Sequence, residues 1–219
     1  MSPLSVFNVS AFQLFSPVFS FQFSAFLFLL QAGLIVKSLP FDEILQLAAT
    51  TLPAAGVGCL LIGGFAVNYY GYTRNTLDID FMIASDQMDA VRDIMHDAGY
   101  TNVSILENVV FFGKPHAFLR VDFLRVDSET MRTLAAHAVT ASINGHTLRI
   151  PALNDLLAMK LFALAQAFER RADKDLPDVA YLCVLNNVDL ERDIHPLCRR
   201  YGSEALYRQV VEKTEALRT

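Results

Sequence analysis

Residues 63–81, GGFAVNYYGYTRNTLDIDF, contain the pattern that decides the fold. Asp78 and Asp80 stand one residue apart within the apolar run LDIDFMIA, residues 77–84. Residues i and i+2 of a strand point to the same face, so a strand here would present both carboxylates together. A buried carboxylate is costly unless it is paired or metal-bound, and paired carboxylates suit hard divalent cations. A lone Asp-x-Asp is nevertheless a short, common pattern that also fits two solvated aspartates at a strand end.

Three neighbouring features favour a metal- and phosphate-binding site over two solvated aspartates at a strand end. Gly63 and Gly64 join an apolar run to a helical pattern, where free backbone N–H groups favour a phosphate and glycine permits its close approach. Arg74 and Thr76 place a fork-shaped cation and a hydroxyl just ahead of the aspartates. Asp122 follows in a later apolar run, where a third carboxylate can complete metal coordination or accept the proton of an attacking hydroxyl.

This combination resembles the core of the DNA polymerase β-type nucleotidyltransferase superfamily. Within it, the chain is most similar to the minimal, AbiEii-like toxin-type nucleotidyltransferases, whose C-terminal helical part carries a lysine and a KDxxD-like segment. The resemblance covers residues 40–185. Gly-Gly-Phe replaces the superfamily's usual Gly-Ser, so a serine contact to the nucleotide phosphate is missing, as it is in the AbiEii-like branch. The matching residues are Gly63, Gly64, Arg74, Thr76, Asp78, Asp80, Asp122, Lys160 and the segment Lys174-Asp175-Leu176-Pro177-Asp178.

The resemblance implies a role for each matching residue. Asp78 and Asp80 would hold one or two Mg²⁺ or Mn²⁺ ions on the triphosphate of a bound nucleotide. Asp122 would complete the metal site and help to deprotonate the acceptor hydroxyl, and Lys160 would act with these three in catalysis. The nucleotide itself would be bound by Gly63, Gly64, Arg74, Thr76, Lys174 and Asp175.

Several of these residues also have a plainer interpretation. Lys160 and Lys174 could lie on a solvated helix face, and Asp175 and Asp178 could be helix N-terminal residues favoured by the helix dipole. Arg120 and Arg125 flank Asp122, and one of them could line a nucleotide channel or pair with Asp127 or Glu129.

The implied reaction moves a nucleoside monophosphate from a nucleoside triphosphate to an acceptor hydroxyl and releases pyrophosphate. By resemblance, the acceptor is a tRNA 3′ end, a protein or a small molecule such as an aminoglycoside, and a toxin would have a cognate antitoxin. The alternative from a different class is a non-catalytic nucleotide-binding regulatory protein of the same fold. The presence of all three carboxylates argues against that alternative.

From residue 37 onward, apolar spacing predicts an α/β (α+β) fold, with a mixed sheet flanked by helices and a helical C-terminal lobe. We expect a nucleotidyltransferase core over 37–150 and the helical lobe over 151–219. Strands are expected at 57–64, 77–84, 103–113 and 117–126, followed by a hairpin over 139–150 with Asn144-Gly145 as its turn. Helices are expected at 38–56, 64–71, 86–100 with Ser85 as its cap, 128–137, 151–171, 175–187 and 203–217.

The first 36 residues differ from the rest, because they contain no charged side chain and eight of the seventeen phenylalanines. Residues 11–36 are long enough to span a bilayer, although Pro17 interrupts them and no positive n-region of a signal peptide precedes them. Three interpretations stay open: a start codon assigned too early, a membrane- or surface-seeking segment, and a packed helix.

Net charge and cysteine content limit the kinds of binding partner and the cellular compartment that we expect. The net charge of −5 provides no global basic field for nucleic acid, so RNA binding would need a local basic groove. The three cysteines are scattered, without a CxxC pair, which indicates buried thiols in a reducing compartment. We therefore expect a cytoplasmic protein.

Overall fold

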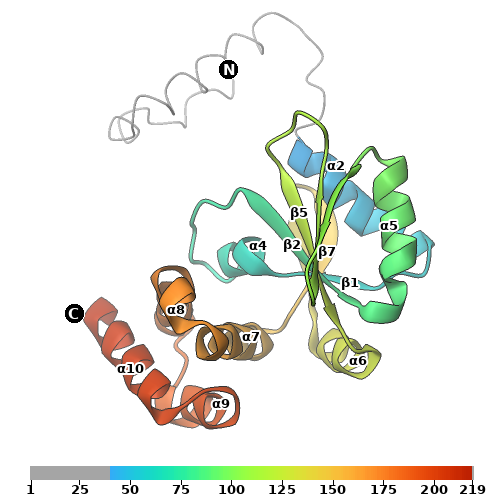
Figure 1. Cartoon of the computed structure of the whole chain (residues 1–219). Coiled ribbons are helices and arrows are strands. Elements are labelled where there is room, and N and C mark those ends of the chain that lie inside the picture. The colour runs from blue at the N-terminus through green and yellow to red at the C-terminus, as the bar shows by residue number, and fades with distance from the viewer. Residues whose placement is uncertain (1–39, 219) are drawn as a thin grey trace, which may run out of the picture. The chain divides into compact units, whose positions relative to one another are not determined.

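A computed structural model of the chain describes residues 40–218, so the expectations for residues 1–36 lie outside the described part. The predicted α/β (α+β) class is confirmed by a mixed five-stranded sheet with flanking helices and by the helices that follow it (Figure 1). The sheet has the order β1-β2-β5-β4-β3, and β6 and β7 form a separate hairpin. The strands are β1 Cys59–Leu61, β2 Asp78–Ala84, β3 Asn102–Ile105, β4 Val109–Gly113, β5 Arg120–Val126, β6 Val139–Ile143 and β7 His146–Ile150.

The strand pairing sets the geometry of the site. Strands β2 and β5 run parallel, whereas β1 is antiparallel to β2 and β4 is antiparallel to both β5 and β3. The register of the parallel pair places Asp80 opposite Asp122 and Asp78 opposite Arg120. The carboxylates from 78–80 and 122 therefore meet across one pair of neighbouring strands.

The two faces of β2 explain why aspartates occur in such an apolar run. One face enters the main hydrophobic core through Ile79, Phe81 and Ile83, which are all fully buried. On the other face, Met82 and Ala84 join a smaller apolar cluster with helix α6. The two aspartates are the first residues on this second face, at the end of the strand that α6 does not cover with apolar side chains. Strand β2 is thus apolar on one face along its whole length and changes from acidic to apolar along the other.

The helices around the sheet lie close to the predicted positions. Helix α6 has the predicted bounds, and the hairpin turn forms at Asn144 and Gly145, which both have positive φ angles of 50° and 82°. The predicted cap at Ser85 is wrong, because its hydroxyl donates to the Val126 carbonyl instead. The elements are α2 Pro40–Gln46, the π-helical turn η2 Leu47–Thr51, α3 Leu52–Ala54, α4 Gly63–Tyr69, the 3₁₀ turn η3 Ser85–Gln87, α5 Met88–Asp97 and α6 Ser128–His137.

The C-terminal helices gather in one group, which the chain enters after β7 (Figure 1). Their apolar side chains form a second core with Ala66 and Val67 of α4, which ties this group to the sheet through the helix that follows the glycines. The elements are α7 Leu153–Gln166, α8 Phe168–Leu185, the π-helical turn η4 Leu190–Ile194, α9 His195–Tyr201 and α10 Glu204–Arg218.

Two predicted element boundaries are wrong. The single strand expected at 103–113 is two strands, β3 and β4, which pair antiparallel as a hairpin. The helices expected at 151–171 and 175–187 divide instead at Ala167, and α8 continues without a break through Pro177. Within residues 40–218, no helix is both long and apolar enough to span a bilayer.

Candidate active site

Three carboxylates meet where β2 and β5 begin. Asp78, Asp80 and Asp122 each offer an oxygen atom, and these atoms all lie within 4.8 Å of one another. We call these three residues the carboxylate triad. Carboxylate oxygens are the ligands that Mg²⁺ and other hard divalent cations prefer, so the donor set fits such an ion.

The glycines of the opening stretch are required by close approach to the triad. Gly63 has a φ of +61°, and a Cβ atom at this position would lie 1.9 Å from Oδ2 of Asp80. A Cβ atom on Gly64 would lie 2.8 Å from the Thr76 hydroxyl oxygen. The start of α4 can therefore contact the Asp80 carboxylate and the Thr76 side chain only because both positions lack a side chain.

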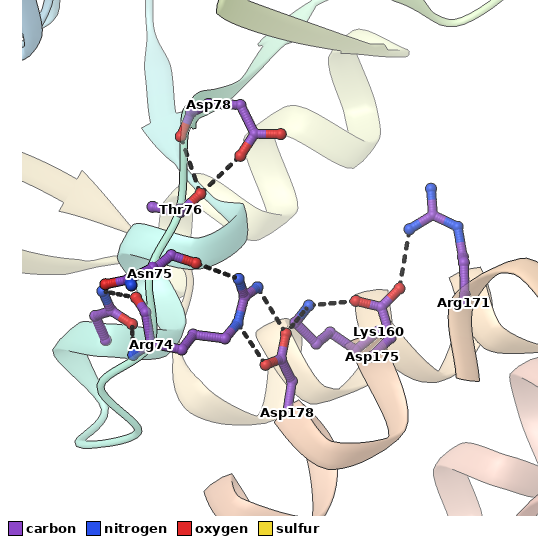
Figure 2. A network of polar contacts seen from close by, with 9 residues as sticks. Arg74, Asn75, Thr76, Asp78, Lys160, Arg171, Asp175 and Asp178 are labelled. Carbon is purple, nitrogen blue, oxygen red and sulfur yellow. Dashed lines mark hydrogen bonds and ion pairs between the residues drawn. The ribbon is translucent and has the colours of Figure 1, made fainter. Parts of the chain in front are cut away.

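Thr76 holds the first aspartate of the triad. Its hydroxyl lies 2.6 Å from Oδ1 of Asp78, to which it donates, as Figure 2 shows. Burial acts to raise the pKa of Asp78, but this hydrogen bond and the charge of Lys174 outweigh it, so the pKa lies below its ordinary value. Asp78 therefore stays ionised.

The other two carboxylates are harder to ionise. Burial, together with the charges of Asp78 and Asp122, raises the pKa of Asp80 to about 6. Burial also raises the pKa of Asp122, although the Arg120 guanidinium acts in the opposite direction. A raised pKa in a crowded acidic cluster means that a positive charge would be bound favourably there.

Arg120 supplies such a charge. Its guanidinium donates to both oxygens of Asp122, at 2.7 and 2.8 Å, and to Asp78 at 3.2 Å. The alternative that Arg120 or Arg125 pairs with Asp127 or Glu129 is wrong, because Arg120 binds the triad and Arg125 donates to the carbonyl groups of Leu106 and Glu107. The signal for the observed pairing is present in the sequence, because residues 120 and 122 lie on the same face of one strand.

A second group of charges links the loop before β2 to the C-terminal helices. Figure 2 shows Arg74 reaching Asp178 on α8, with nitrogen–oxygen distances of 2.7 and 2.9 Å. Lys160 on α7 lies 2.6 Å from an oxygen of Asp175 and 2.6 Å from one of Asp178. Arg171 pairs with Asp175 at 2.9 Å. We call these five residues the α8 network.

The structure thus divides the predicted site residues into two groups. The triad lies with Gly63, Gly64 and Thr76, whereas Arg74, Lys160 and Asp175 bind one another or Asp178. Asp175 and Asp178 are buried in the middle of α8, so their interpretation as helix N-terminal residues is wrong.

Lys174 connects the two groups through its charge alone. It is exposed on α8 and makes no hydrogen bond or ion pair within residues 40–218. Its charge nevertheless acts to lower the pKa of each triad carboxylate. The exposed side of α8 therefore contributes a free ammonium group close to the triad.

The family assignment follows from a sequence comparison that agrees with this geometry. The family described as "Nucleotidyl transferase AbiEii toxin, Type IV TA system" matches residues 47–215. The chain belongs to this family. It is therefore a nucleotidyltransferase, as the resemblance of the glycine and aspartate pattern predicted. A search of curated proteins finds no match.

Two solved structures are similar to this AbiEii family member, and the first of them shows the same fold. The crystal structure of ANT(2")-Ia in complex with adenylyl-2"-tobramycin is 13% identical with a TM-score of 0.57, covering 73% of this chain and 98% of that one. The lincomycin-bound lincosamide antibiotic adenylyltransferase LnuA is 14% identical with a TM-score of 0.48, covering 65% of this chain and 94% of that one. At such low identity, the first similarity establishes the fold, whereas substrates must be argued from the site.

Proposed function

We propose that the protein is a metal-dependent nucleotidyltransferase that moves a nucleoside monophosphate from a nucleoside triphosphate to an acceptor hydroxyl. The observation that carries the proposal is the carboxylate triad, three acidic oxygens within 4.8 Å of one another beside Gly63 and Gly64. Asp78, Asp80 and Asp122 would hold Mg²⁺ or Mn²⁺, which would neutralise charge on the triphosphate. This donor set consists only of carboxylates, so it is suited to a hard ion rather than to zinc.

The reaction needs few further groups from the protein. The acceptor oxygen forms a bond to the α-phosphorus, the bond from this phosphorus to the oxygen that bridges it to the β-phosphate breaks, and pyrophosphate leaves. Asp122, beside the metal, would accept the proton of the acceptor hydroxyl. Lys174 lies close enough to the triad to attract the triphosphate.

The α8 network has a positioning role in this proposal. Lys160 is buried and paired with two aspartates, and Arg74 is paired with Asp178. These cations fix the loop 74–76, whose Thr76 in turn holds Asp78. Direct contact of Arg74, Lys160 or Asp175 with the nucleotide would need these ion pairs to rearrange.

We further propose that the protein is the toxin of a toxin–antitoxin pair and acts in the cytoplasm, where nucleoside triphosphates are available. The family description supports the toxin role. The acceptor is a tRNA 3′ end, a protein hydroxyl or a small molecule such as an aminoglycoside, and the fold similarity to ANT(2")-Ia keeps the last class in the test.

Label transfer tests this proposal. Purified protein is incubated with Mg²⁺ or Mn²⁺ and each α-³²P-labelled nucleoside triphosphate, with total tRNA, cell lysate protein or aminoglycosides as acceptors. We expect label in one acceptor class, and loss of label with Asp78→Asn, Asp80→Asn or added EDTA. Asp97→Asn, which changes an exposed carboxylate outside the site, should transfer label normally. Label that persists in the triad variants would contradict the proposal, and nucleotide binding without transfer would favour the regulatory protein.

A further inference from the structure

Both oxygens of Asp122 are engaged by one guanidinium. Nε of Arg120 lies 2.7 Å from Oδ1 of Asp122, and Nη2 lies 2.8 Å from Oδ2 of Asp122 and 3.2 Å from Oδ2 of Asp78. A bidentate pair of this kind uses one in-plane lone pair of each carboxylate oxygen. Arg120 therefore takes up part of the ligating capacity that two triad members would offer to a metal ion.

A guanidinium and a divalent cation compete for such oxygens. Mg²⁺ binds carboxylate oxygens at about 2.0–2.1 Å, which is direct contact. The two positive charges repel strongly at such separations. Each oxygen of Asp122 keeps a second lone pair, but a metal ion bound there would lie close to the guanidinium, so the repulsion between the two cations favours the loss of at least one Arg120 hydrogen bond.

Arg120 is placed so that it can move. Its side chain is 54% exposed, and its guanidinium carbon lies 4.9 Å from the centre of the Phe111 ring, a stacking contact that needs no carboxylate. Arg74 makes a similar bidentate pair but is 16% exposed, and its partner Asp178 is completely buried. Of these two arginine–aspartate pairs, the one at the triad is thus the one that solvent can separate.

We propose that Arg120 is the resident counter-ion of the triad, and that a divalent cation displaces it from Asp122 and Asp78 when it binds. The inference rests on the proposed function, because it assumes that the triad is the metal site. Arg120 is then a positioning residue that holds the carboxylates together before the metal arrives.

Direct measurement of Mn²⁺ binding tests the exchange without using activity. Free Mn²⁺ is followed by electron paramagnetic resonance in titrations of the full-length chain and of Arg120→Gln. Arg120 makes three charge-assisted hydrogen bonds to the triad, so removal of this competitor should tighten Mn²⁺ binding about tenfold, which corresponds to about 1.4 kcal/mol. Weaker binding by Arg120→Gln, or no change, would overturn the inference.

A charge-matched control distinguishes direct displacement of Arg120 from the long-range effect of removing one positive charge. Lys174→Gln also removes one positive charge near all three carboxylates, but it breaks no hydrogen bond to them. We expect it to tighten Mn²⁺ binding by about twofold, as a screened interaction between solvent-exposed charges would. Equal effects of Lys174→Gln and Arg120→Gln would overturn direct competition.

Thermal unfolding gives a second, independent measurement. Without metal, Arg120→Gln should unfold about 2–4 °C below the wild-type protein, because the triad has lost its counter-ion. Saturating Mn²⁺ should remove this difference, since the ion replaces the guanidinium. A difference that persists at saturating Mn²⁺ would mean that Arg120 is merely structural.

Failure of the inference is distinguishable from failure of the proposed function. If neither the wild-type protein nor Arg120→Gln binds Mn²⁺, the triad is not a metal site and both proposals fall. If the wild-type protein binds Mn²⁺ and Asp80→Asn abolishes this binding, the metal site stands, and the affinity of Arg120→Gln alone decides the inference.

Discussion

The carboxylate triad and the α8 network are adjacent clusters of charge with opposite balances. The triad has three aspartates and one arginine partner, Arg120, which is half exposed and pairs with Asp78 and Asp122. In the network, two buried aspartates are paired with Arg74, Lys160 and Arg171. The triad therefore carries an excess of negative charge, and the network does not.

This difference separates a binding site from a structural link. A buried charge with a complete set of partners is satisfied, and removal of one partner is strongly destabilising. In the triad, burial together with the charges of neighbouring carboxylates raises the pKa values of Asp80 and Asp122. Loss of a triad carboxylate should therefore affect activity more than stability, and loss of a network carboxylate should affect stability first.

The largest effect is expected from the triad. Asp80→Asn should reduce nucleotide transfer about a thousandfold, because several kcal/mol of charge stabilisation depend on this carboxylate. The unfolding free energy in the absence of metal should stay the same or rise, since the variant relieves repulsion from Asp78 and Asp122. Initial rates and urea unfolding measure the two quantities. A large loss of stability would place Asp80 among the structural charges.

The network should respond in the opposite way. Asp178→Ala leaves Arg74 without its buried partner and Lys160 with only one, so it should lower the unfolding free energy by about 3–5 kcal/mol. Arg171→Ala removes a half-exposed partner of Asp175 and should cost at most about 1 kcal/mol. Urea unfolding measures both. If both variants lowered the unfolding free energy by a similar amount, buried Asp178 would be no more important for stability than half-exposed Arg171.

Gly63, which lies against Asp80, should affect both stability and metal binding when it is replaced. Gly63→Ala combines a positive φ with a Cβ 1.9 Å from Asp80, so we expect a loss of about 3 kcal/mol together with weaker Mn²⁺ binding. Gly56→Ala is the matched control, because Gly56 has a φ of +76° and open space around its Cβ position. It should cost about 1 kcal/mol, the effect of backbone strain alone. Normal Mn²⁺ binding by Gly63→Ala would contradict the close approach to Asp80.

The last effect concerns pH. The pKa of Asp80 is about 6 in the folded protein and 3.8 ordinarily, so the folded state binds the extra proton between these values. Without metal, the contribution of Asp80 to the unfolding free energy should therefore fall by up to about 3 kcal/mol as the pH rises through this window. Asp80→Asn should remove this decrease.

The α8 network should make the unfolding free energy depend on pH in the opposite direction, with stability lost as the pH falls. Burial acts to raise the pKa of Asp175, but Lys160 and Arg171 outweigh it, so the pKa lies below its ordinary value. Its stabilising contribution is present above the ordinary aspartate pKa and is lost as the pH falls through the folded value. Urea unfolding at a series of pH values in EDTA should thus show an additional loss of stability as the pH falls below the ordinary aspartate pKa. Stability that stays constant or rises as the pH falls through this range would contradict this expectation.

Much of the sheet and the triad could be predicted from the sequence because both follow from a local rule. Side chains of a strand alternate between two faces, so LDIDFMIA predicts two aspartates on one face and Ile79, Phe81 and Ile83 in the core. The Asn144-Gly145 turn and helix α6 also depend on residues close in the chain. Resemblance to the nucleotidyltransferase pattern brought in Asp122, which lies 42 residues after Asp80.

The remaining features depend on contacts between distant residues, which no local pattern specifies. The cation at position 74 pairs with Asp178, 104 residues later, so the sequence could show an arginine near the aspartates but not which acid it binds. Helix α8 continues through Pro177, although proline lacks an N–H donor and disfavours a helix interior. Buried ion pairs and apolar contacts on either side of Pro177 offset that cost. The sequence by itself therefore determined which face of β2 is acidic, and the tertiary structure decided which cations neutralise the neighbouring acids and which acids remain for a metal ion.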